Sequence, residues 1–133
     1  MSDYLIAHIG HSIHEHIVWW KPDERGYTVC IDKAGKYSET AAQAICRPGS
    51  CIAVTMRVAL EFARGTPYYR LSTGDLARLY DGGEHRVVPN SKEAWKYLLA
   101  WRLDTEGMDK PSKPTPIGRK SRAIYLPKIG GAA

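Results

Sequence analysis

Two short runs of β-branched and aromatic residues, separated by a turn sequence, constrain the fold of this chain more than any other feature. The first run is HEHIVWW and the second is GYTVCI, and the segment KPDER lies between them. Val, Ile, Thr, Tyr and Trp favour strands, and a proline, an aspartate and a glycine between two such runs favour a tight connection. We therefore predict an antiparallel hairpin over residues 14–31, with a loop of four to six residues.

The rest of the chain alternates between strand and helix patterns. A first strand is predicted over residues 3–10, and CIAV at 51–54 has the composition of a short buried strand. Ser38, Thr55 and either Ser91 or Asn90 are candidate N-cap residues for three helices, because a side-chain oxygen before a helical pattern accepts a bond from its first turn. The three predicted helices span residues 38–47, 56–64 and 91–103, and further strands are predicted between residues 67 and 88. The fold class is therefore α+β, with a small antiparallel or mixed sheet that starts with the N-terminal hairpin and two to three packed helices.

The charge of the chain divides it into a body and a tail. Residues 1–109 carry 13 Lys and Arg against 14 Asp and Glu, whereas residues 110–133 carry six Lys and Arg and no acidic residue. Several prolines in this last segment disfavour a helix and favour an extended path. We predict one compact domain over residues 1–106 and a basic, extended tail over residues 107–133, in which SRAIYLP is apolar enough to dock as an edge strand, on this molecule or on a partner.

Composition also indicates where the protein works. No apolar run approaches the roughly 20 residues that span a bilayer, and the first residues lack the pattern of a signal peptide. Three cysteines without a C-x-x-C pair are not a secreted disulfide framework. We therefore expect a cytoplasmic protein without a membrane partner; the sequence does not indicate its oligomeric state.

The histidines near the N-terminus raise the question of a metal site. In an extended strand His14 and His16 point to one face about 6.6 Å apart, close enough to share an ion. Zinc would need a third and a fourth ligand, for which His11, His8, Glu15 or a cysteine across the hairpin are candidates. However, the chain has no H-E-x-x-H motif, and the fifth histidine, His85, is far along the sequence. We interpret the histidines as scaffold or surface and expect no cofactor; a zinc site at His11, His14 and His16 is the alternative.

Aromatic and basic residues predict a binding surface. Alternation places Trp19 and Trp20 on opposite faces of their strand, so one indole is free to contact a partner if the sheet is covered on one side. The chain has no phosphate-binding loop and no dinucleotide fingerprint. Binding is therefore assigned to aromatic side chains and cations, which recognise proteins and nucleic acids. The candidates are Trp19, Trp20, Arg25, Tyr27, Tyr69, Arg70, Arg119, Lys120 and Arg122.

The hairpin carries one resemblance. The pattern W-x-P-x-x-x-G-Y-T-x-x-I-x-x-A-G-x-Y begins at Trp20 and ends at Tyr37. It is similar to small uncharacterised accessory proteins encoded by bacteriophages and prophages of Gram-negative bacteria. The resemblance implies a host-takeover protein or a counter-defence inhibitor that occupies the surface of a macromolecule in the host bacterial cell. Many such inhibitors are acidic mimics of DNA, and the basic tail departs from that pattern.

Together these features predict a non-enzymatic accessory protein. It binds a host or phage protein, or a nucleic acid, through the aromatic hairpin and the basic tail. The alternative function is a metal-supported, zinc-type enzyme that uses the N-terminal histidines, with an acid such as Glu15 as its base.

Overall fold

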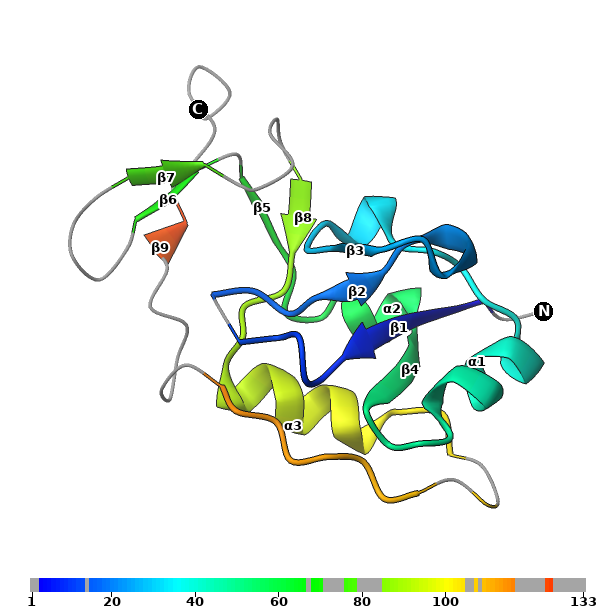
Figure 1. Ribbon diagram of the computed structural model, residues 1–133. Coiled ribbons are helices and arrows are strands. Elements are labelled where there is room, and N and C mark those ends of the chain that lie inside the picture. The colour runs from blue at the N-terminus through cyan, green and yellow to red at the C-terminus, as the bar shows by residue number, and fades with distance from the viewer. Residues whose placement is uncertain are drawn as a thin grey trace.

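The computed structural model of the protein describes residues 3–13, 15–66, 68–70, 76–78, 85–104, 107, 109–116 and 124–125. Its centre is a four-stranded antiparallel sheet with the strand order β3-β2-β1-β4 (Figure 1). These strands are β1 (Tyr4–His8), β2 (Trp19–Trp20), β3 (Tyr27–Thr28) and β4 (Cys51–Thr55). The helices are α1 (Glu39–Cys46), α2 (Met56–Ala59) and α3 (Lys92–Ala100), with two short 3-10 turns, η1 (Pro22–Glu24) and η2 (Ile31–Lys33). The prediction of an α+β fold is confirmed.

The predicted hairpin is present, but its arms β2 and β3 have only two residues each, and Ile31, predicted as the end of the second strand, begins η2 instead. Trp19 pairs with Thr28 and Trp20 pairs with Tyr27. The loop closes where the backbone N–H of Lys21 donates to the carbonyl of Gly26 over 2.8 Å. Gly26 has a φ of +101°, which a residue with a side chain rarely adopts. The hydroxyl of Tyr37 braces the loop, since it accepts from the backbone N–H of Glu24 and donates to the carbonyl of Lys21.

Alternation along the strands gives the sheet two buried faces. Leu5, Ala7, Trp19 and Val54 pack on one face with side chains of α2 and α3. Ile6 and Ala53 point the other way and pack with α1. Because successive side chains of a strand alternate, the register of β1 against β4, in which Leu5 pairs with Val54 and Ile6 with Ala53, places each set together. The two cores therefore lie on opposite sides of a single sheet.

Two of the predicted helices are shorter than expected. The Thr55 hydroxyl caps α2 as predicted, but the helix ends at Ala59 instead of residue 64. Residues Arg64–Thr66 instead form β5, which pairs with β8 (His85–Val87). The backbone N–H and C=O groups at this end of the predicted helix therefore bond to a strand. Likewise α3 ends at Ala100, because the chain turns and the N–H of Leu103 donates to the carbonyl of Ala53 in β4 over 2.7 Å.

A third sheet includes part of the basic tail. β6 (Tyr68–Arg70) lies between β7 (Leu76–Arg78) and β9 (Ile124–Tyr125). The prediction that SRAIYLP docks as a strand is therefore confirmed for Ile124–Tyr125. Before this strand, residues 109–116 run without regular structure along α3 (Figure 1). The N–H of Asp109 donates to the carbonyl of Arg47, and that of Ser112 donates to the carbonyl of Gly49. We call residues 109–116 the strap.

A buried amide joins the N-terminal loop to α3. The Asn90 side chain donates to the carbonyl of Ser12 over 2.9 Å and accepts from the indole N–H of Trp95 over 2.6 Å. Backbone bonds continue this junction, from Ile17 to Val88 and from Asn90 to Glu15. The chain between β1 and β2 is thereby held against the start of α3. No helix in the described part of the chain is long and apolar enough to cross a membrane.

Candidate functional site

Four aromatic and imidazole rings gather where β1, β2 and β3 meet the loop after β1. The rings of His8 and His11 are stacked, with centroids 4.2 Å apart. Tyr27 contacts His11 at 4.4 Å, His8 at 5.4 Å and Trp20 at 4.4 Å. We call these four residues the hairpin surface. Tyr27 is 36% exposed and His11 is exposed, whereas His8 and Trp20 are half-buried and form the base of the cluster.

The sheet register explains this gathering. Tyr27 lies opposite Trp20 in the hairpin, and β1 pairs with β2 on its other side. The chain turns back after β1, so the backbone N–H of His11 donates to Nδ1 of His8 over 3.2 Å. Helix α1 covers the same face of the sheet at Ile6 and Ala53. The hairpin surface lies on the same face and retains contact with solvent, since His11 and Tyr27 are exposed.

His8 and Tyr27 of the hairpin surface are uncharged at neutral pH. Burial, followed by the proximity of His11, lowers the pKa of His8 below its usual value. Burial also raises the pKa of Tyr27, so its hydroxyl keeps its proton. In the adjoining loop, Asp23 and Glu24 lie between Lys21 and Arg25. Such a surface offers ring faces, ring edges and N–H or O–H donors, which suits stacking and hydrogen bonding more than the capture of an ion.

The cysteines are poor candidates for nucleophiles. All three thiols are free and buried. Burial raises the pKa of Cys46 to about 12, with a smaller contribution from the neighbouring Cys51. Burial also raises the pKa of Cys51, although hydrogen bonds with Trp20 and Ser50 act in the opposite direction. Because the thiolate is the reactive form, the Cys46 and Cys51 thiols remain protonated and unreactive at neutral pH.

The predicted binding residues have different positions. Trp19 is completely buried in the core, and Trp20, on the opposite face of the sheet, is half-buried. Tyr27 belongs to the hairpin surface, and Arg25 is exposed in the adjoining loop. The backbones of Tyr69 and Arg70 form part of β6. Arg119, Lys120 and Arg122 lie outside the described residues.

The predicted metal ligands do not gather within the described part of the chain. His11 stacks on His8 at the surface. His16 is 1% exposed and lies beside Pro89, where burial lowers the pKa of its imidazole to about 4. His14 lies outside the described residues. Among the residues that are described, no three His, Cys, Asp or Glu side chains are close enough together to hold an ion.

Sequence reasoning missed one member of the hairpin surface. The sequence offers His8 only as a candidate zinc ligand, because its contacts with Trp20 and Tyr27 depend on the pairing of β1 with β2. The signal in the sequence is weak: Gly10 ends the predicted strand two residues after His8 and indicates a turn there, but it does not indicate which residues His8 contacts. The partner of that strand was not visible in the sequence.

Comparison of the chain with protein-family models, with curated proteins and with solved structures gives no match. The geometry of the molecule therefore carries the functional argument.

Proposed function

We propose that this protein is a non-enzymatic binding protein that recognises a partner protein through the hairpin surface. The observation that carries the proposal is the contact network of His8, His11, Trp20 and Tyr27 at the open part of the sheet. Tyr, Trp and Arg supply most of the binding energy in many protein interfaces, because they bury large areas and still make hydrogen bonds. Arg25 lies in the adjoining loop and adds such a group.

The charge around the hairpin surface favours a protein over a nucleic acid as the partner. Affinity for nucleic acids depends on cations that neutralise phosphates. Beside the hairpin surface, Lys21 and Arg25 are balanced by Asp23 and Glu24. Nucleic-acid binding would therefore depend on the basic tail, including Arg119, Lys120 and Arg122, and it would weaken steeply as salt is raised. We keep it as the alternative partner.

The likeness of residues 20–37 to phage accessory proteins supports a more specific version of the proposal. In this version the partner is a protein of the host bacterium, and the chain acts in the cytoplasm as a host-takeover protein or a counter-defence inhibitor. Blocking a surface requires no catalytic group, which is compatible with buried, protonated thiols.

The test is capture of partners from a bacterial extract with and without nuclease treatment, followed by affinity measurement with the captured protein. We expect Tyr27→Ala and His11→Ala to weaken binding about tenfold or more, as at interface hot spots. Trp101→Ala is the matched control, because Trp101 is an aromatic residue with 58% exposure that lies outside the hairpin surface. Capture that nuclease abolishes, or equal losses in Trp101→Ala, would contradict the proposal.

Metal analysis tests the rival function separately. Protein purified without a histidine tag is expected to contain no stoichiometric zinc. One equivalent of zinc or another transition metal, lost in the double variant His11→Ala/His14→Ala, would favour the zinc-type enzyme instead.

A further inference from the structure

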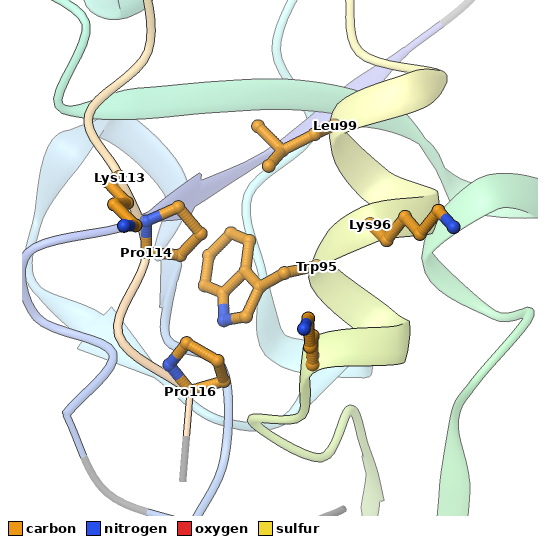
Figure 2. Close-up of a pocket in the computed structure, with 7 residues that line it drawn as sticks. Trp95, Lys96, Leu99, Lys113, Pro114 and Pro116 are labelled. Atoms are coloured by element: carbon orange, nitrogen blue, oxygen red, sulfur yellow. The ribbon is translucent and has the colours of Figure 1, made fainter. Parts of the chain in front are cut away.

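A cleft of about 430 Å³ lies between α3 and the strap. Its floor and walls are apolar: Trp95 and Leu99 come from α3, and Pro114 and Pro116 come from the strap. Figure 2 shows the indole of Trp95 extending from the helix toward the two proline rings. Small-molecule sites in proteins typically have volumes of about 300–1,000 Å³ and mostly apolar walls. The cleft therefore has the size and lining of a site for a small ligand.

The walls of the cleft are held in place by bonds outside it. Trp95 is 2% exposed, and its indole N–H donates to the side chain of Asn90 over 2.6 Å, which sets the orientation of the ring. The strap is anchored before the two prolines, where the N–H of Ser112 donates to the carbonyl of Gly49 over 2.7 Å. Proline has a restricted backbone, so Pro114 and Pro116 limit the freedom of the opposite wall. The cleft is therefore formed before any ligand enters.

The rim of the cleft is positively charged. Lys92 and Lys96 lie on α3 and Lys113 lies on the strap, and all three are exposed. Among the described residues that line the cleft, none is acidic; Glu93 is next to Lys92 in α3 and is not part of the lining. Lysine side chains are long and flexible, so ammonium groups from both walls can reach an anion at the mouth.

From this arrangement we infer that the cleft binds a small amphipathic anion, with a flat or linear apolar body and one carboxylate or comparable oxyanion. The apolar body contacts Trp95, Leu99 and the prolines, and the anion stays at the mouth among the lysines. A peptide backbone is a poor occupant, because its N–H and C=O groups would lose water and find almost no partners in these walls. A cation is disfavoured by the three lysines.

This site is separate from the hairpin surface. Trp95 and the rest of α3 pack on the face of the sheet that carries Leu5 and Trp19, whereas Trp20 and α1 belong to the other face. A ligand in the cleft also contacts both α3 and the strap, so its binding is expected to hold the strap in place. The inference therefore does not depend on the proposed function.

The experiment compares 2-naphthoate with its neutral isostere 2-naphthamide, using the full chain. The readouts are calorimetric affinity and the NMR signal of the Trp95 indole N–H. We expect 2-naphthoate to bind at least about fivefold more tightly than 2-naphthamide, because its carboxylate forms one or two exposed ion pairs with the lysines. We also expect it to shift the Trp95 indole signal. Equal affinity of the acid and the amide, an unmoved Trp95 signal, or no binding of either compound at millimolar concentration would overturn the inference.

Charge-reversal variants locate the anion. Lys92→Glu and Lys113→Glu are each expected to lower the affinity of the protein for 2-naphthoate about fivefold. The affinity for 2-naphthamide is expected to stay the same. Lys36→Glu is the matched control, because Lys36 is an exposed lysine before α1 that does not line the cleft. All three positions are exposed, so the variants are expected to fold. If Lys36→Glu weakens binding as much as the other two, only the general charge of the protein matters and the proposed site is wrong.

Discussion

His16 shows how one side chain can set the response of the whole protein to pH. It lies beside Pro89 at the junction between the N-terminal loop and the start of α3, and it is 1% exposed. Burial disfavours the charged imidazolium and lowers the pKa of His16 from 6.5 to about 4. In the unfolded chain the same imidazole takes up a proton near its ordinary pKa.

We predict that the free energy of unfolding falls as the pH is lowered from about 6.5 to 4. Over this range the unfolded chain binds a proton at residue 16 and the folded protein does not, so acid favours unfolding by up to about 3 kcal/mol. Urea denaturation at several pH values measures this slope. His16→Phe is expected to flatten the slope, whereas His11→Gln, which changes an exposed histidine, should leave most of it. Equal slopes in the wild type and His16→Phe would contradict the prediction.

At the scale of elements, the turn between α1 and β4 anchors the strap. Gly49 has a φ of +84°, and a Cβ at this position would lie 2.6 Å from the carbonyl oxygen of Lys110. Its own carbonyl accepts the bond from Ser112. The glycine therefore serves both the turn and the close approach of the strap.

Gly49→Ala and Gly107→Ala separate these two effects. Both glycines have positive φ, but a Cβ at Gly107 meets nothing within 4 Å. Gly107→Ala is expected to cost about 1 kcal/mol from backbone strain alone, and Gly49→Ala is expected to cost more and to loosen the strap. Hydrogen exchange of the Ser112 amide measures that loosening. Equal exchange of this amide in the two variants would show that the close contact at Gly49 does not hold the strap.

At the scale of the whole molecule, part of the predicted tail belongs to the folded structure. The strap covers one side of α3, and β9 adds a strand to β6. Trp95 is 2% exposed and is lined on one side by Pro114 and Pro116. The domain predicted over residues 1–106 therefore does not bury all of its apolar surface without the strap.

Two truncations test the contribution of the strap. Removal of residues 108–133 uncovers Trp95 and Leu99 and is expected to lower the free energy of unfolding by about 2–4 kcal/mol, with a red shift of tryptophan fluorescence. Removal of residues 126–133 leaves the strap and β9 and serves as the control. Urea denaturation followed by fluorescence distinguishes them. If both truncated proteins unfold at the same urea concentration, the strap contributes nothing to stability.

Much of the fold was predictable because its signals are local. The hairpin, the capping hydroxyls of Ser38, Thr55 and Ser91, and the opposite faces of Trp19 and Trp20 all depend on residues within a few positions of one another. The overlong prediction for α2 failed for the opposite reason. Its end is set by pairing of Arg64–Thr66 with β8, about 20 residues further along the chain.

Long-range packing determined both candidate sites. By itself the sequence determined the α+β class, the hairpin and the positions of the aromatic and basic residues, because alternation, capping and turn chemistry act over short distances. Only the tertiary structure decided that His8 joins Trp20 and Tyr27, and that Lys113 and Pro114 face Trp95 and Leu99. Those neighbours come from strand pairing and from a strap bonded to a distant turn, and no periodicity along the chain encodes such contacts.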